Sequence, residues 1–295
     1  MSRPPIIQTV RDLQDAAERE RAAGRRIALV PTMGALHAGH LSLVKAAREH
    51  ADVVWMSIFV NPTQFNDSND FGAYPADLSR DLELCASHGV DLVFAPAPGE
   101  LYPEGAQTWV EVGELAESLC GATRPGHFRG VTTVVTKLFL AARPHVAVFG
   151  QKDFQQLAII RRMERDLGFG IEIVGAATVR EPDGLALSSR NLHLGPQARQ
   201  QALVLVRALD VAEDSLARGE ASHEALVALV ARTIDTASLA RLDYAELRDP
   251  DTLRSARAQI TAPTLLALAV HFAPDPDGQG RKVRLIDNRV LQPQR

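Results

Sequence analysis

Two histidines stand three residues apart in the segment PTMGALHAGH, residues 31–40. The segment follows a short apolar run and leads into a stretch with helical periodicity. Gly34 and Gly39 would let the backbone approach a phosphate without a Cβ in the way, and the imidazoles of His37 and His40 could donate hydrogen bonds to phosphate oxygens. The segment therefore indicates an anion site at a strand-to-helix junction, where free helix amides also favour negative charge.

Two other interpretations of this segment stay open. The glycines are also typical turn residues, which would leave the histidines as surface or packing side chains. Histidines three apart can also share a face and bind a metal ion, although no acidic or cysteine ligand lies nearby in the sequence.

Polar residues also follow two other apolar runs. In SIFVNPTQF, Asn61 and Gln64 come where a strand should end, and in FGQKDFQQ, Lys152 opens a helix. An Asn-Pro turn, and a solvated lysine beside an N-cap at Asp153, are simpler explanations of each segment alone. Because the carboxyl ends of parallel strands meet at one edge of a sheet, we expect these clusters to converge with residues 31–40 on one crevice.

The segment GLALSSRN carries Ser188, Ser189 and Arg190 near a change in the sequence pattern. In isolation it is typical of a polar linker. Beside a nucleotide site it would form a flap. Arg190 would then bind phosphate from this flap, because arginine's planar fork matches two phosphate oxygens at once.

The elements that position these residues are predicted from hydrophobic patterning. Apolar runs typical of buried strands alternate with helical periodicities, which indicates right-handed βαβ units and a doubly wound, Rossmann-like parallel sheet. We predict strands at 26–30, 52–60, 90–96, 145–150 and 170–175. We predict helices at 39–50, 77–89, 130–144 and 153–168.

The pattern changes in the last third of the chain. We predict a domain boundary between residues 184 and 185, followed by a smaller α+β domain. Its expected helices are 196–219 and 222–237, and its expected strands are 241–249, 264–272 and 282–291.

The composition limits the class of function. The chain has 295 residues, 46% hydrophobic and 23% charged, as globular proteins do. A formal charge of −4, from 36 acidic and 32 basic residues without a basic block, argues against nucleic acid as a partner. Two unclustered cysteines, Cys85 and Cys120, indicate a reducing compartment. Since no secretory segment or apolar stretch of about 18 residues is found, we expect a cytoplasmic protein without a membrane partner.

PTMGALHAGH resembles the H-x-x-H signature of the HIGH-motif nucleotidyltransferase superfamily, in which both histidines bind ATP phosphates. More narrowly, it resembles the signature of the pantothenate synthetase (pantoate–β-alanine ligase) family. SIFVNPTQF, GHFRGVTTVVTKLF, FGQKDFQQ and DGLALSSRN are similar to further blocks of that family, in the same order, over residues 27–195. Gln151 and Ala38 stand where the family commonly has glutamate. YPADLSRDLE departs more, so we assign Asp81 no metal-associated role.

The resemblance implies an ATP-dependent ligase that condenses pantoate with β-alanine through a pantoyl adenylate, giving pantothenate, AMP and pyrophosphate. It implies ATP as co-substrate, Mg²⁺ carried on the phosphates without named protein ligands, and a homodimer. Residues 1–184 would bind ATP and pantoate, and residues 185–295 would act as a lid that shields the adenylate from water.

The resemblance also assigns residues to the site. Gln64 and Gln156 would bind pantoate, since an amide offers a donor and an acceptor without charge, and Gln64 would also bind β-alanine. Pro31, Met33 and Phe59 are candidates for an apolar wall. The implied catalytic residues are His37, His40, Lys152 and Arg190. The implied ATP-binding residues are Met33, Gly34, Ala35, Leu36, His37, Ala38, Gly39, His40, Gly150, Gln151, Lys152, Asp153, Val179, Leu187, Ser188, Ser189 and Arg190.

Two other classes of function stay open. An adenylyltransferase acting on a phosphorylated acceptor would share the first motif but should need extra basic residues. A nucleotide-binding module without turnover would share the fold, because fold alone does not establish catalysis.

Overall fold

The computed structural model describes residues 3–65, 72 and 76–293, so Tyr74 and Pro75 of the YPADLSRDLE segment lie outside the described residues. It divides into two compact units. The first comprises Met1–Gln151 and Ile159–Ala177, and the second comprises Lys152–Ala158 and Thr178–Arg295. The expected boundary after residue 184 and the lid role of the C-terminal domain stay predictions.

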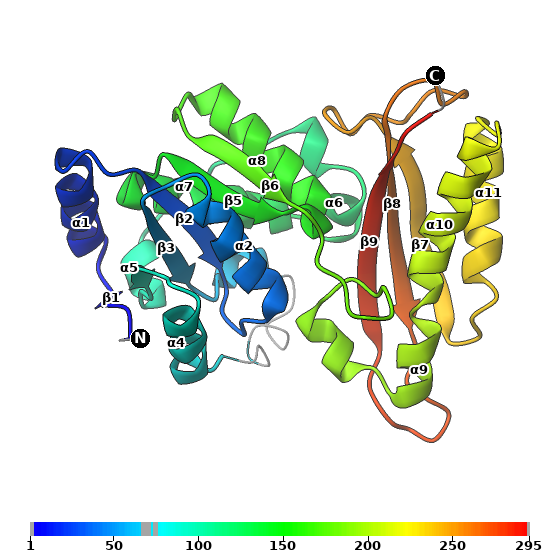
Figure 1. Ribbon diagram of the computed structural model, residues 1–295, viewed down its shortest axis with the longest axis horizontal. Helices are drawn as coiled ribbons and strands as arrows, with labels where there is room; N and C mark the ends of the chain where they lie inside the picture. The colour runs from blue at the N-terminus through cyan, green and yellow to red at the C-terminus, as the bar shows by residue number, and fades with distance from the viewer. Residues whose placement is uncertain (1–2, 66–71, 73–75, 294–295) are drawn as a thin grey trace. The chain divides into compact units, whose positions relative to one another are not determined.

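The first unit is built on a six-stranded sheet in which every neighbouring pair of strands is parallel (Figure 1). This confirms the parallel sheet and all five predicted strands, to which a short edge strand is added. In spatial order the strands are β1 (Ile6–Ile7), β4 (Leu92–Phe94), β3 (Val53–Ile58), β2 (Ile27–Thr32), β5 (Val146–Gly150) and β6 (Glu172–Ala176).

The strand order reverses beside β2. From β2 the chain builds β3 and β4 on one side, and it then returns to add β5 and β6 on the other side. In an open α/β sheet, ligands bind beyond the carboxyl ends of the strands at such a reversal. The ends of β2 and β5 are therefore where the fold favours a ligand site.

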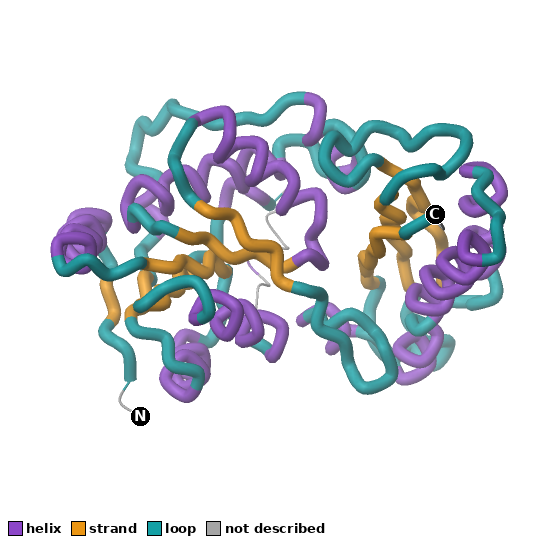
Figure 2. The backbone as a smooth tube through the Cα atoms, turned by 45° about the horizontal axis from the view of Figure 1, so that its top comes forward, coloured by secondary structure: helices purple, strands orange, loops and turns teal. Residues whose placement is uncertain are grey.

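Helices cover both faces of this sheet, which confirms the doubly wound architecture (Figure 2). On one face, Val30, Met56 and Val148 pack in a buried cluster with Val44 and Cys85 of two helices. On the other, α1 and α7 pack together and both contact β2. The helices of this unit are α1 (Val10–Ala22), α2 (Ala38–Arg48), α4 (Leu78–Ser87), α5 (Pro98–Leu101), α6 (Cys120–Thr123) and α7 (His127–Ala142), with 3₁₀ turns η1 (Pro62–Gln64) and η2 (Glu114–Ala116). The turn η3 (Gln151–Asp153) and helix α8 (Phe154–Leu167) include residues of both units.

The second unit contains a three-stranded antiparallel sheet in the order β7-β8-β9, which confirms the predicted α+β region. Helix α11 packs on β7, and α10 packs on β8 and β9, around one buried apolar cluster. The elements are η4 (Ser189–His193), α9 (Pro196–Gln201), α10 (Val204–Ala217), α11 (His223–Ile234), β7 (Ala240–Arg248), β8 (Thr264–Phe272) and β9 (Val283–Leu291).

The single helix predicted over 196–219 is wrong, because the chain ends one helix at Gln201 and begins another at Val204. Between them the backbone tightens, and the Leu205 amide bonds the carbonyl of Ala202, three residues back. The Gln201 side chain accepts a hydrogen bond from the Leu239 amide at 2.8 Å. Contacts this distant in sequence leave no trace in local periodicity.

In the part of the chain that the structure describes, no helix combines the length and the apolar composition needed to cross a bilayer.

Candidate active site

The predicted polar clusters follow strands that are neighbours in the first unit. Strand β2 pairs with β3 on one side and with β5 on the other, so the carboxyl ends of all three lie side by side. Residues 33–40 follow β2, Asn61 and Gln64 follow β3, and Gly150 ends β5. The strand ends from which these clusters come are therefore neighbours, whereas the shared crevice stays a prediction.

His37 and His40 cap the start of α2 reciprocally. His37 is the N-cap residue, and its Nδ1 accepts a hydrogen bond from the Gly39 amide at 3.1 Å. The Nδ1 of His40 accepts in turn from the His37 amide at 3.3 Å. The ring centroids lie 4.1 Å apart. Two imidazoles thus do what serine and glutamate do in the usual capping box.

These caps determine where the imidazole protons lie. A backbone amide only donates, so each Nδ1 is the unprotonated nitrogen and each Nε2 carries the proton. Both rings therefore present an Nε2–H donor, which suits a phosphate oxygen. The same arrangement argues against the metal pair, because each Nδ1 accepts an amide hydrogen bond and each Nε2 carries the proton, so neither ring keeps a lone pair for a metal ion. Over the described residues, no group of three His, Cys, Asp or Glu side chains could hold a metal ion.

Most backbone amides of this loop have acceptors within the protein. Those of Ala35 and Leu36 donate to the Asp81 carboxylate at 2.9 and 2.8 Å. The Leu36 side chain lies in the core, so only its backbone could meet a nucleotide. The exposed Ala38 has no acceptor for its amide within the described residues. That amide is consequently a donor suited to an anion.

Gln64 is held in a defined orientation at the end of η1. Its Oε1 accepts from Asn61 Nδ2 at 3.0 Å, and its Nε2 lies 2.7 Å from the sulfur of Met33. Because Asn61 Nδ2 can only donate, the oxygen of the Gln64 amide must face it. The structure therefore brings together Gln64 and Met33, two of the predicted pantoate-site residues. Phe59 is nearly fully buried, whereas Pro31 is half-buried.

The backbone of Gln64 is held by the first residue of α7 and by the residue that ends α6. The Gln64 carbonyl accepts from His127 Nδ1 at 2.8 Å and from Arg124 Nη2 at 3.3 Å. A Cβ built on Gly130 would lie 2.4 Å from the carbonyl oxygen of Thr63, so only glycine lets α7 approach η1 this closely. The sequence block around these residues carries part of the family resemblance, but the sequence alone assigned none of them a role.

In the second unit, a hairpin carries the predicted flap. The Leu187 amide donates to the Val179 carbonyl at 2.9 Å, which brings these two predicted ATP-site residues together. Ser188 caps η4, since its hydroxyl accepts from the Arg190 amide at 3.2 Å. Arg190 is an exposed residue, and Ser189 is half-buried.

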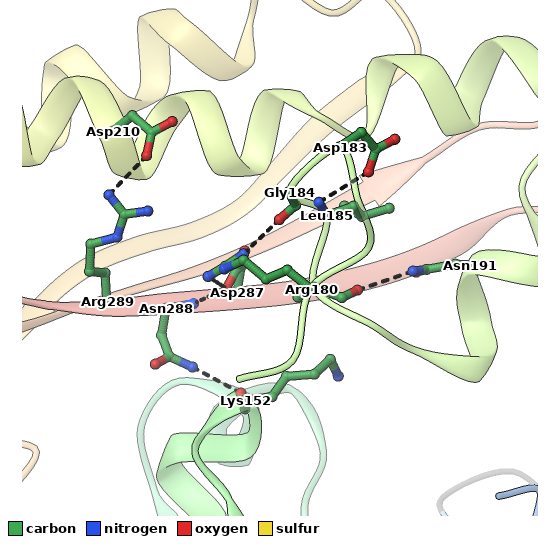
Figure 3. A network of polar contacts seen from close by, with 11 residues as sticks. Lys152, Arg180, Asp183, Gly184, Leu185, Asn191, Asp210, Asp287, Asn288 and Arg289 are labelled. Atoms are coloured by element: carbon green, nitrogen blue, oxygen red, sulfur yellow. Dashed lines mark hydrogen bonds and ion pairs between the residues drawn. The ribbon is translucent and has the colours of Figure 1, made fainter. Parts of the chain in front are cut away.

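The base of this hairpin is fastened by an ion pair (Figure 3). Arg180 reaches both carboxylate oxygens of the buried Asp287, at 2.7 and 3.0 Å, and also donates to the Gly184 carbonyl at 3.0 Å. Hydrogen bonding to Asp287 raises the pKa of Arg180. Asn288, next along β9, donates to the Lys152 carbonyl at 2.9 Å, so β9 also fixes the backbone at Lys152.

The segment after β5 is divided between the units. Gln151 belongs to the first unit, where its Nε2 donates to the Gly175 carbonyl at 3.1 Å. Lys152, Asp153 and Gln156 belong to the second unit. Asp153 is exposed, and Lys152 and Gln156 are half-buried.

Comparisons with known proteins agree in family. A family model described as pantoate-beta-alanine ligase matches residues 5–290. A pantothenate synthetase of Syntrophobacter fumaroxidans is 50% identical over 288 residues, covering 98% of this chain and 99% of the relative. The structure of pantothenate synthetase from Thermus thermophilus is 44% identical with a TM-score of 0.89, covering 98% of this chain and 100% of that one. A pantoate-beta-alanine ligase from Francisella tularensis, complexed with beta-gamma ATP and beta-alanine, is 33% identical with a TM-score of 0.76, covering 97% of each chain.

Proposed function

Since the chain belongs to the pantoate–β-alanine ligase family, it joins pantoate to β-alanine with ATP to form pantothenate, and we propose that it does so through a pantoyl adenylate. The pantoate carboxylate attacks the α-phosphate of ATP and releases pyrophosphate. The β-alanine amine then attacks the acyl carbon and releases AMP. The observation that carries this proposal is the reciprocal Nδ1 capping by His37 and His40 at the strand-order reversal, which leaves Nε2 as the protonated nitrogen of each ring.

The first step needs positioning rather than an enzymic nucleophile. Attack on a phosphate requires the reacting groups in line and the growing charge on the leaving pyrophosphate neutralised. We assign this to the Nε2–H groups of His37 and His40, with Lys152 as a point charge and Arg190 as a bidentate phosphate ligand. The Ala38 amide adds a neutral donor at the start of α2. Ser188 and Ser189 supply further hydroxyl donors.

Gln64 is assigned to pantoate and, in the second step, to β-alanine, and Gln156 is assigned to pantoate. Pantoate carries a carboxylate, two hydroxyls and two methyl groups, so a neutral amide beside an apolar wall suits it. The amide of Gln64 lies against the Met33 side chain and is oriented by Asn61, which matches that requirement.

Mg²⁺ belongs to this proposal as a partner of ATP. The donors at the start of α2 are imidazole and amide N–H groups, which suit phosphate oxygens, while Asp81 already accepts two amides. Mg²⁺ keeps several waters and commonly binds through substrate phosphates, where it neutralises their charge. We therefore name no protein ligand. A cytoplasmic location and a homodimer are likewise proposed from the family alone.

Substrate omission tests this proposal. Pyrophosphate should be released when ATP and pantoate are supplied without β-alanine, and AMP should appear when β-alanine is added. Pyrophosphate release that needs no pantoate, or that needs a phosphorylated acceptor, would indicate a different adenylyltransferase. The absence of any product from folded protein that binds ATP would indicate a binding module.

A further inference from the structure

One buried carboxylate beside the loop of residues 33–40 has no part in the proposed mechanism. Asp81 lies on α4 and is 1% exposed. Its Oδ2 accepts from the Ala35 amide at 2.9 Å and its Oδ1 accepts from the Leu36 amide at 2.8 Å. Both oxygens of a side chain 45 residues away are thus committed to two consecutive amides of the loop.

The backbone that Asp81 holds is one that the chain does not adopt readily. Gly34 has φ of +81° and Ala35 has φ of +50°. The left-handed region is unfavourable for a residue with a Cβ, so Ala35 needs outside support to stay there. The two hydrogen bonds to Asp81 provide that support at Ala35 itself and at the next residue.

Gly34 and Asp81 also fit each other in space. A Cβ built on Gly34 would lie 2.7 Å from Asp81 Oδ2. The carboxylate therefore occupies the space that a Cβ at residue 34 would need, so glycine fits against it. Burial raises the pKa of Asp81, and the bonds from Leu36 and Ala35 act in the opposite direction.

The turn at residues 34–36 determines where α2 and its two capping histidines lie. Leu36 directly precedes His37, whose side chain and backbone start α2. The geometry points to Asp81 as a positioning residue that fixes residues 34–36 so that the Nε2–H groups of His37 and His40 meet the nucleotide in reactive geometry. This inference rests on the proposed function for what the histidines bind, but not for the loop geometry itself.

Asp81→Asn tests the inference with two readouts. The asparagine keeps one acceptor oxygen and sets an NH₂ against the other amide, so one hydrogen bond is lost. We expect amide hydrogen exchange in the peptide spanning residues 33–40 to speed up by at least about tenfold in the free protein. We expect pantoate-dependent pyrophosphate release in a single turnover to slow by about tenfold to a hundredfold, with the pantoate KM within about threefold.

Cys85→Ala is the matched control. Cys85 lies one turn later on α4, is fully buried and places its thiol against the sulfur of Met56, a residue of β3. It should lower thermal stability while exchange in 33–40 and the single-turnover rate stay within about twofold of wild type. Equal effects of both variants on the rate would overturn the positioning role, because a general loss of packing would then explain it.

If Asp81→Asn does not fold, Asp81→Glu takes its place in the test, because its extra methylene must displace the turn at Gly34. Amide exchange in residues 33–40 and a single-turnover rate that both equal those of wild type would then overturn the inference. If wild-type protein releases no pyrophosphate while exchange in 33–40 still depends on Asp81, the proposed function fails and the loop-fixing role stands.

Discussion

At the residue scale, the central feature is a pair of histidines that do two tasks with two nitrogens each. Each Nδ1 caps α2, and each Nε2 carries a proton that suits an anion. The spacing of the histidines predicts an anion site, but the sequence does not show that the rings serve as caps. That follows only from the hydrogen bonds, because imidazole is an unusual N-cap side chain.

Substitutions at His40 separate these two tasks. His40→Asn can still accept from the His37 amide but lacks a group at the Nε2 position, whereas His40→Gln places an amide N–H near that position. We expect His40→Ala and His40→Asn to slow single-turnover pyrophosphate release by roughly 10²- to 10³-fold, since one preorganised donor is worth that much. His40→Gln should retain at least about tenfold more activity than His40→Asn. Equal losses in all three folded variants would mean that the distal donor does not act in the reaction.

The positioning role of Asp81 is one that residue types alone do not reveal. The carboxylate lies in the segment that departs most from the family pattern, and the sequence therefore predicts no metal role for it. Its two bonds join residues that are far apart in sequence, and neither composition nor periodicity reports such a bond. An acidic residue on the buried face of a predicted helix was the one available signal.

At the element scale, the site depends on how closely α7 approaches η1. Gly130→Ala would place a Cβ 2.4 Å from the Thr63 carbonyl oxygen and must displace η1, which carries Gln64. We expect pantoate-dependent pyrophosphate release to fall at least about tenfold, with ATP affinity within about threefold. Calorimetry and initial rates on the same samples measure both.

Gly99→Ala is the control for this prediction. Gly99 lies in the short helix α5, and a Cβ there would meet no atom within 4 Å. It should leave both quantities unchanged. If Gly130→Ala weakened ATP binding and spared pantoate use, Gln64 would belong to the nucleotide and not to pantoate.

The hairpin that carries the predicted flap depends on β9. Asp287→Asn would leave Arg180 without its charged partner in a mostly buried position. Breaking a buried pair typically costs about 3–5 kcal/mol, and we expect the lower end because the Arg180 side chain is 26% exposed. Urea unfolding measures the change in the free energy of unfolding.

The more exposed pair of Arg289 and Asp210 is the comparison, with the Asp210 side chain 51% exposed. Asp210→Asn should change the free energy of unfolding by no more than about 1 kcal/mol, because exposed ion pairs usually contribute no more than that to stability. A similar loss from both variants would show that burial of Asp287 does not set the strength of its pair.

At the scale of the whole molecule, the alternation of strand and helix was enough to predict a doubly wound sheet followed by an α+β region. Strands buried on both faces are continuous apolar runs, and such runs are visible in sequence. The break between Gln201 and Val204 was missed, as were β1 and α1. The break lies where the Gln201 side chain accepts a hydrogen bond from the distant Leu239 amide, and the edge strand is too short to leave a pattern.

The core of the first unit makes stability depend on pH at the alkaline end. Burial raises the pKa of Cys85 from 9.0 to about 12, so the folded state holds this proton after the unfolded state has lost it. Stability is therefore fully present below about pH 9 and falls as pH rises toward about 12. Cys85→Ala should flatten this part of the fall in denaturant unfolding. An unchanged slope between wild type and variant would contradict the buried thiol as its cause.

The pantoyl adenylate is the intermediate on which all the proposed phosphate-binding roles depend, and oxygen labelling tests its formation most directly. In the reaction of pantoate labelled with ¹⁸O in its carboxylate, attack on the α-phosphate forms a carboxyl–phosphate bond, and the later attack of β-alanine on the acyl carbon leaves that oxygen on AMP. Mass spectrometry of the products should find one ¹⁸O in AMP and none in pyrophosphate. Unlabelled AMP formed together with pantothenate would contradict the adenylate, and with it the roles assigned to the residues that hold the phosphates.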